Sequence, residues 1–118
     1  VLSVITVESR FNKYAISSAG AQGIMQVMPF WVRQIGAYDQ DLLNVQTNIR
    51  FGCTILRHYM QLEHGDTFYA LGRYNGSRGK PDYPNLVFNA YNRYWQPAAV
   101  MTIAKNGQVK YVDYSSVN

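Results

Sequence analysis

A single carboxylate closes the apolar stretch with which the chain begins. Glu8 follows residues 1–7, most of them apolar, and no other acidic residue occurs before Asp39. Burial among apolar neighbours disfavours the charged form of a carboxyl and raises its pKa. A carboxyl that keeps its proton near neutral pH can serve as a general acid. Glu8 is therefore the candidate catalytic residue, and the alternative is a solvated structural glutamate on a helix surface.

The helix that must present Glu8 is predicted over residues 1–10. Val4 and Glu8 are four positions apart, which makes them neighbours on a helix surface. The β-branched residues of this stretch also favour a strand, but the apolar positions do not alternate strictly, so we expect a helix. The chain starts without Met and in the middle of the apolar pattern. We therefore expect that this helix is truncated and that any signal peptide or lipid anchor lies upstream.

A loop of small residues follows this first helix. Its structure-breaking residues are Ser17, Ser18, Gly20 and Gly23. Glycines permit either a close approach of the backbone to a ligand or simply a tight turn. Residues 22–28 are predicted to form a short helix, which ends near Met28 because the residue before a proline avoids the α region.

Glu8 and the loop behind it resemble the signature of the lytic transglycosylase SLT domain, a family related to goose-type lysozyme. The matching pieces are Glu8-Ser9, Ser17-Ser18-Ala19-Gly20-Ala21, Gly23-Ile24-Met25-Gln26 and Met28-Pro29. Later pieces that resemble the family are Arg73-Tyr74-Asn75-Gly76, and Tyr83 with Asn85-Leu86-Val87. The similarity covers roughly residues 1–95. The sequence departs from the family pattern at Ile24, where Leu is usual, at Arg73, where Ala is usual, and at Ser77, where Gly is usual.

This resemblance implies a mainly α fold, a lysozyme-like helical domain that we expect to span residues 1–97. The tail, residues 98–118, lies outside the resemblance. Two apolar segments, 100–104 and 108–112, flank Asn106-Gly107. Such a dipeptide between apolar runs predicts a short β-hairpin, to which we assign no catalytic role.

The resemblance also implies an enzyme that cleaves peptidoglycan. In that family the β-1,4 bond between N-acetylmuramic acid and N-acetylglucosamine is broken and a 1,6-anhydromuramyl end is formed. Glu8 would act first as the acid and then as the base. Most glycosidases use two carboxylates, but no other acidic residue of this chain lies in a family-like motif. The sequence therefore favours a mechanism with one carboxyl group.

Further residues match family positions that bind the substrate. They are Ser9, Ser17, Met25, Gln26, Tyr74, Asn75 and Tyr83. Ser18 also fits the loop serine, and the spacing to Gly20-Ala21 favours Ser17. The alternative role is core filling for Met25, core packing for each tyrosine and local hydrogen bonding for Ser9.

Three other functions compete with this reading. A hydrolytic muramidase of the goose type would differ only in letting water reach the intermediate. A non-catalytic glycan- or partner-binding domain of a cell-wall or secretion assembly would not need an acid at Glu8. A nucleic-acid adaptor is disfavoured because the Lys and Arg residues are scattered and form no basic run.

Charge and hydropathy narrow the class of protein further. The net charge is +4 and the pI is near 9.3, which suits an anionic partner such as peptidoglycan. No stretch is long and apolar enough to span a membrane. From the resemblance we expect a periplasmic, cell-envelope or extracellular protein, and we favour a monomer.

No metal or cofactor site is predicted. His58 and His64 are six positions apart, which does not place them on one helix face, and no cysteine pairs with them. Cys53 is the only cysteine, so an intrachain disulfide is excluded. Its apolar helical surroundings predict a buried core thiol.

The remaining elements are predicted from apolar periodicity and capping residues. Helices are expected after Pro29 as far as Gly36, over 45–63, over 67–75, and from Pro84 to about Tyr94. Asn44 and Asp66 are the expected N-caps of the second and third of these. The helix 45–63 is predicted to be central and buried. Its two apolar faces are formed by Ile49, Cys53, Leu56 and Met60, and by Phe51, Ile55 and Leu62.

Overall fold

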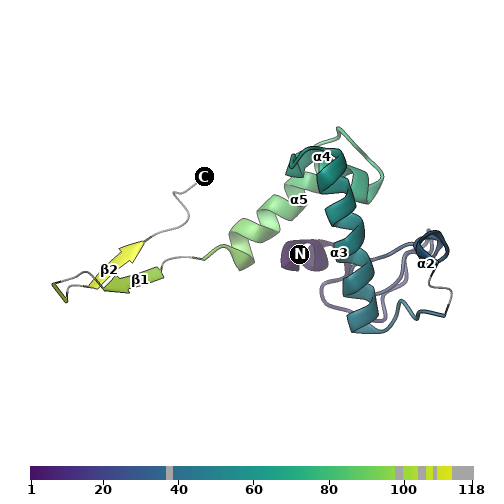
Figure 1. Cartoon of the computed structure of the whole chain (residues 1–118), viewed down its shortest axis with the longest axis horizontal. Helices are drawn as coiled ribbons and strands as arrows, with labels where there is room; N and C mark the ends of the chain where they lie inside the picture. Colours follow the sequence, from purple (N-terminus) through teal and green to yellow (C-terminus); the bar gives the residue numbers. More distant parts are fainter. Residues whose placement is uncertain (37–38, 98–99, 104–105, 108, 113–118) are drawn as a thin grey trace.

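The structure is a computed structural model that describes residues 1–36, 39–97, 100–103, 106–107 and 109–112. Its elements are α1 (Leu2–Ser9), α2 (Phe30–Ile35), α3 (Val45–Leu62), α4 (Thr67–Asn75), α5 (Asp82–Ala90), the π-helix η1 (Tyr91–Trp95), β1 (Val100–Ile103) and β2 (Val109–Val112). The protein is mainly helical, as the sequence predicts (Figure 1). None of the helices in the described ranges is both long and apolar enough to cross a membrane.

Helix α3 is the longest element, and it runs through the middle of the helical body in Figure 1. The Asn44 side chain accepts a 3.0 Å hydrogen bond from Thr47 N and caps its start, as predicted. Its buried face is formed by Asn48, Phe51, Gly52 and Ile55. The predicted face that contains Cys53 is only partly buried and packs beside the core.

Two of the predictions for α3 need correction. Leu62 is 46% exposed, although the periodicity places it with Phe51 and Ile55. It is the last residue of α3, where the chain leaves the core. Cys53 is half-buried and not fully enclosed, since the buried stripe is centred on Gly52.

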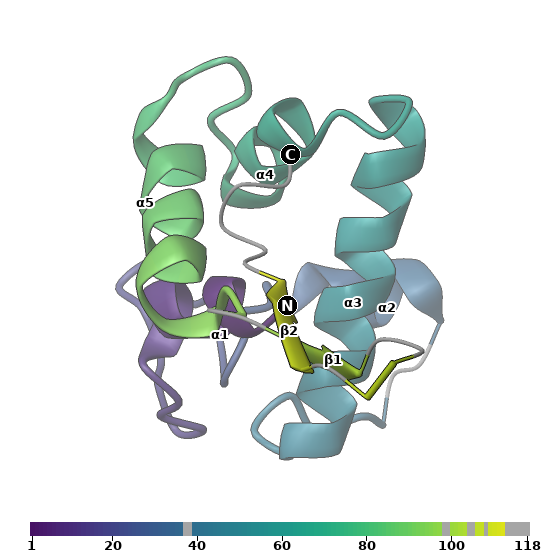
Figure 2. The same ribbon diagram turned by 90° about the vertical axis from the view of Figure 1, so that its left-hand side faces the viewer.

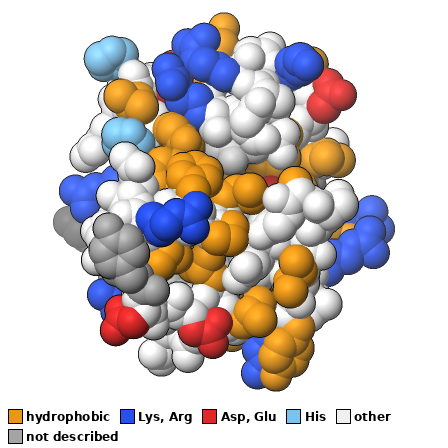
Figure 3. All heavy atoms as spheres, turned by 90° about the vertical axis from the view of Figure 1, so that its right-hand side faces the viewer, with side chains coloured by type: hydrophobic (Ala, Val, Ile, Leu, Met, Phe, Trp, Pro, Cys, Tyr) orange, Lys and Arg blue, Asp and Glu red, His pale blue; other side chains and the backbone are white. Residues whose placement is uncertain are grey.

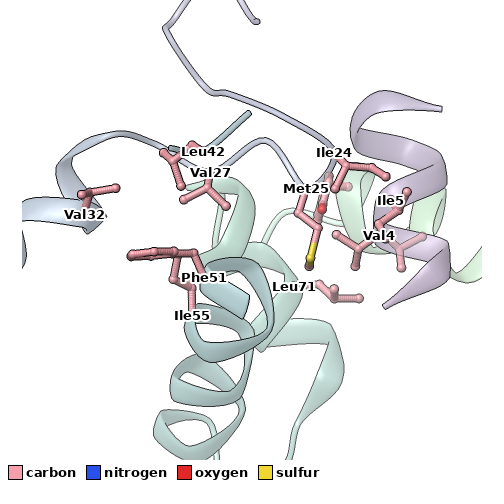
Figure 4. Packing of buried hydrophobic residues seen from close by; sticks show 12 residues of the cluster. Val4, Ile5, Ile24, Met25, Val27, Val32, Leu42, Phe51, Ile55 and Leu71 are labelled. Carbon is pink, nitrogen blue, oxygen red and sulfur yellow. The ribbon is translucent and has the colours of Figure 1, made fainter. Parts of the chain in front are cut away.

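One loop residue of the core, Met25, has a fully buried side chain. Figure 4 shows its sulfur between Val4 of α1 and Leu71 of α4. A Cβ atom on Gly52 would lie 2.4 Å from Met25 Sδ, so α3 requires a glycine where the methionine packs against it.

Helices α1 and α5 pack against each other, and η1 continues α5 along the same side of the body (Figure 2). The predicted last helix therefore ends close to the expected position, but its last turn has π geometry. Trp95 Nε1 donates a 2.9 Å hydrogen bond to Thr6 Oγ1, and the Trp95 ring lies 5.8 Å from that of Phe11. The end of η1 thus holds the helix that carries Glu8.

The segment 22–28 is not the short helix that the sequence predicts. Gln22 instead forms isolated antiparallel bridges with Ile16 and Val27, and Gln26 has a left-handed backbone, with φ of 53°. A helix would need Gln26 in the right-handed region. Contacts with distant residues, described below, hold the segment as a folded loop.

The remaining predicted elements are confirmed. Asp66 caps α4 by accepting a 3.2 Å hydrogen bond from Tyr69 N, and Gly36 ends α2 with φ of 81°. Strands β1 and β2 pair antiparallel from Val100↔Val112 to Ile103↔Val109. Ala104 and Gln108, which the prediction includes, lie outside the described residues. The hairpin lies beyond η1, away from the helices (Figure 1), and a domain boundary after residue 97 stays a prediction.

Candidate active site

Glu8 lies in the last turn of α1, where the helix turns into the loop. Its side chain is half-buried, and this burial raises the pKa of its carboxyl above the ordinary value. The unpaired carbonyls at a helix C-terminus also disfavour a negative charge. The chain leaves α1 through Arg10 and Phe11, both with positive φ, which is uncommon outside glycine. The helix end therefore positions a carboxyl that holds its proton more strongly than an ordinary glutamate does.

Two tyrosines flank Glu8. Tyr83, at the start of α5, is 5% exposed, and a hydrogen-bonding interaction with its hydroxyl partly offsets the rise in the Glu8 pKa. Among the described residues, Tyr83 Oη has no partner in ordinary hydrogen-bond geometry, yet it is close enough to Glu8 for each to affect the other's pKa. Burial and the Glu8 charge raise the pKa of both Tyr83 and Tyr74. Both phenols therefore stay protonated, and Tyr83 can donate its O–H toward the carboxylate.

Hydrogen bonds tie the end of α1 and helix α4 to the loop. Ser9 Oγ donates a 2.7 Å hydrogen bond to Ile24 O, and Tyr74 Oη donates one of 2.8 Å to Met25 O. Ser9 follows Glu8 in the sequence and Tyr74 lies near it in space. The two hydroxyls thus bind the carbonyls of two consecutive loop residues, Ile24 and Met25. Ser9 and Tyr74 act on the loop backbone in this structure, and contact with a substrate stays a prediction for both.

Met25 and Gln26 form the inner part of the loop. Met25 has 0% of its surface exposed, so its side chain fills the core, which is the alternative role that the sequence allows for it. Gln26 Nε2 donates to Ala15 O at 3.0 Å and to Gly23 O at 2.8 Å. These bonds stabilise the left-handed turn at Gln26. Substrate binding by either residue stays a prediction.

Ser17 and Asn75 make their hydrogen bonds within their own segments. Ser17 Oγ accepts a 3.0 Å hydrogen bond from Ala21 N, which closes the small-residue loop. Asn75 Nδ2 donates to Ser77 Oγ at 2.8 Å, just after α4. The structure thus brings Glu8, Ser9, Met25, Tyr74 and Tyr83 together and leaves Ser17 and Asn75 as expected substrate ligands whose roles are untested. Ser18, the alternative to Ser17, is exposed.

Asn48 holds the loop from the other side, and sequence reasoning missed it. It is 0% exposed, and its Oδ1 accepts from Met25 N at 2.8 Å. Its Nδ2 donates to Gln22 O and Leu42 O, both at 2.8 Å. A Cβ on Gly23 would lie 2.2 Å from Asn48 Nδ2, so the loop passes close to this amide. The signal in the sequence is a polar residue four positions before Gly52, on the buried face of a helix.

On the face shown in Figure 3, hydrophobic side chains gather in the middle, and charged and His side chains lie among and around them. Two surface hollows are lined by Lys13, Tyr14 and the start of α3, and by Ile35, Arg50 and Phe51, so neither is formed at Glu8. In the part of the chain that the structure describes, no group of His, Cys, Asp and Glu could hold a metal ion.

The chain belongs to the Transglycosylase SLT domain family, which it matches over residues 1–92. Its fold is similar to two solved structures. The 70 kDa soluble lytic transglycosylase of Escherichia coli aligns with a TM-score of 0.57 and 24% identity over 77% of this chain. An inactive mutant of the lytic transglycosylase Slt from Pseudomonas aeruginosa aligns with a TM-score of 0.56 and 27% identity over 82%. The chain covers 15% and 16% of those two proteins.

Proposed function

We propose that the protein is a peptidoglycan lytic transglycosylase in which Glu8 is the acid and the base. The observation that carries the proposal is the placement of Glu8 at the end of α1, half-buried beside two tyrosines, where its pKa is raised. The family and the lytic transglycosylases of similar fold support the class of reaction. Peptidoglycan as the substrate and a periplasmic or envelope location follow from the same relationship.

The reaction requires a proton to move to the substrate and back. Protonated Glu8 donates its proton to the glycosidic oxygen while the bond from that oxygen to C1 of the muramyl residue breaks. The 2-acetamido group of the substrate stabilises the developing positive charge at C1. The Glu8 carboxylate then takes the proton from the muramyl 6-hydroxyl, whose oxygen attacks C1 and closes the anhydro ring. Glu8 ends protonated, and no water is consumed.

Three of the five other described carboxylates already take part in local structure, which favours a mechanism with one carboxyl group. Glu63 is bound by Arg73 and Arg78, and Asp66 caps α4. Asp41 Oδ1 accepts a 2.9 Å hydrogen bond from Leu43 N. Because these groups stabilise local structure, none of them is poised as the second carboxylate that most glycosidases place across the scissile bond.

Mass spectrometry of the products tests the proposal. Purified peptidoglycan is incubated with the wild type and with Glu8→Gln, which keeps the shape of the side chain but cannot exchange the proton. We expect anhydro-muropeptides from the wild type and none from the variant. Reducing-end muropeptides, heavier by one water, would identify a hydrolytic muramidase that uses the same residue.

A measurement of peptidoglycan binding distinguishes the enzyme from the remaining alternative, a non-catalytic glycan-binding domain. If the wild type releases no product but wild type and Glu8→Gln bind peptidoglycan equally, the protein is a glycan-binding domain and the proposed activity is wrong.

A further inference from the structure

One carboxylate at the end of α3 holds two arginines. Glu63 follows the last residue of α3, and its Oε1 accepts a 2.6 Å hydrogen bond from Arg73 Nε on α4. Arg78 Nε donates to the same oxygen, and Arg78 Nη2 donates to Oε2 at 3.0 Å. Only 8% of the Glu63 side chain is exposed, whereas the side chains of Arg73 and Arg78 are 37% and 50% exposed. Glu63 therefore joins α3 to α4 and to the loop 76–81.

The loop 76–81 is folded back closely on α4. Ser77 N donates a 2.7 Å hydrogen bond to Gly72 O, and a Cβ on Gly72 would lie 2.9 Å from Arg78 Cα. The Arg78 guanidinium lies 4.5 Å from the centre of the Tyr69 ring, so it is held by a ring as well as by Glu63. The path of the loop thus depends on where Arg78 is anchored.

This loop connects the two tyrosines that flank Glu8. Arg73 directly precedes Tyr74, and Tyr83 is the second residue of α5, the helix that follows the loop. Two positions of this region also differ from the family pattern: Arg73 binds Glu63, and Ser77 accepts the hydrogen bond from Asn75. The departures from the pattern therefore take part in holding the loop.

We propose that Glu63 is a positioning residue that sets the path of the loop 76–81. Through Arg73 it orients the end of α4, and through Arg78 it fixes the approach of the chain to Tyr83. Tyr83 then encloses the carboxyl of Glu8. This inference rests on the proposed function in that Glu8 is taken as the catalytic group.

The charge of Glu63 is constant under working conditions. Hydrogen bonds from Arg78 and Arg73 hold the pKa of Glu63 at about 2. Glu63 therefore stays ionised near neutral pH, and its ion pairs with Arg73 and Arg78 do not act as a pH switch there. Replacing Glu63 with glutamine, a neutral side chain of the same shape, removes the main attraction between this position and both guanidinium groups.

The experiment is Glu63→Gln, followed by nuclear magnetic resonance of the protein labelled with ¹³C at glutamate side chains. Because the chain has only two glutamates, this variant leaves Glu8 as the single labelled carboxyl. We expect the Glu8 titration to move down toward the ordinary value, since a loosened loop admits water and burial is the main cause of the raised pKa. Product release from peptidoglycan should fall about tenfold or more, as is usual when a catalytic group is misplaced.

A second variant and a matched control complete the test. Arg78→Gln removes the ion pair of Glu63 with Arg78 and leaves the one with Arg73. The Glu8 titration in this variant therefore tests the proposal if Glu63→Gln does not fold. Arg57→Gln removes one positive charge, as Arg78→Gln does, but at an exposed position of α3. It should leave the pKa of Glu8 unchanged. Unchanged Glu8 titration in folded Glu63→Gln and Arg78→Gln would overturn the proposal. The titration needs no substrate, so absence of product from the wild type would count against the proposed function alone.

Discussion

Tyr74 Oη donates a 2.8 Å hydrogen bond to the carbonyl of Met25, which is 49 positions away in the sequence. This bond joins α4 to the loop behind Glu8 and places a partly buried phenol beside the candidate acid. The loop is held from α3 by a second long-range contact, the hydrogen bond from Met25 N to Asn48 Oδ1. Both polar groups of the Met25 backbone are thus paired with distant side chains.

The first prediction concerns the hydrogen bond from Tyr74 to the Met25 carbonyl. Tyr74→Phe leaves the Met25 carbonyl without its partner, and we expect unfolding in urea to become easier by about 1–2 kcal/mol. Activity on peptidoglycan should fall as well, because the loop next to Glu8 loosens. Tyr14→Phe is the matched control, since Tyr14 is 67% exposed and should lose little. Equal stability of the two variants would contradict the prediction.

Replacing the buried amide of α3 should be more damaging. Asn48→Leu leaves two backbone groups unpaired, Met25 N and Leu42 O, and removes one of the two hydrogen bonds at Gln22 O, which Val27 N still donates to. We expect a loss of about 2–4 kcal/mol in the free energy of unfolding, measured by chemical denaturation. Asn44→Asp provides the control, because an aspartate also caps a helix and should cost little. A loss under about 0.5 kcal/mol for Asn48→Leu would mean that the loop does not need the amide.

A third prediction tests the contact between Gly52 and Met25. Gly52→Ala places a methyl group 2.4 Å from Met25 Sδ. The alanine favours the helix by about 1 kcal/mol, but overpacking a well-filled core typically costs about 1–3 kcal/mol. We expect a net loss of stability, seen as a lower Tm, and a loss for the double variant with Met25→Ala that is smaller than the sum of the two single losses. Strictly additive losses would show that the two side chains do not meet.

The raised pKa of Glu8 predicts how stability depends on pH. A carboxyl whose folded pKa lies above its unfolded value binds more protons in the native state between the two values. The wild type should therefore lose stability, relative to Glu8→Gln, as the pH rises from about 4.3, the unfolded value, through the raised pKa. Denaturation at a series of pH values measures this difference. Asp39→Asn changes an exposed carboxylate and serves as the control; a pH-independent difference between wild type and Glu8→Gln would contradict the raised pKa.

Much of the secondary structure could be predicted because its signals are local. Asn44 and Asp66 each cap a helix that starts at the next residue, and Asn106-Gly107 lies between two paired strands. The helix of Glu8 was expected from an apolar run that precedes it. The folding of 22–28 was not predicted, because the backbone there is held by Asn48 and not by its own neighbours.

By itself the sequence determined the helices, the hairpin and the carboxyl that follows the first apolar run, since caps, turn residues and apolar periodicity act over a few positions. Only the tertiary structure decided that Met25 fills the core, that Asn48 holds the loop and that Glu63 joins two arginines. The physical reason is that a buried polar group takes whatever partner the packing brings to it, and a pattern along the chain does not identify a partner that lies tens of residues away.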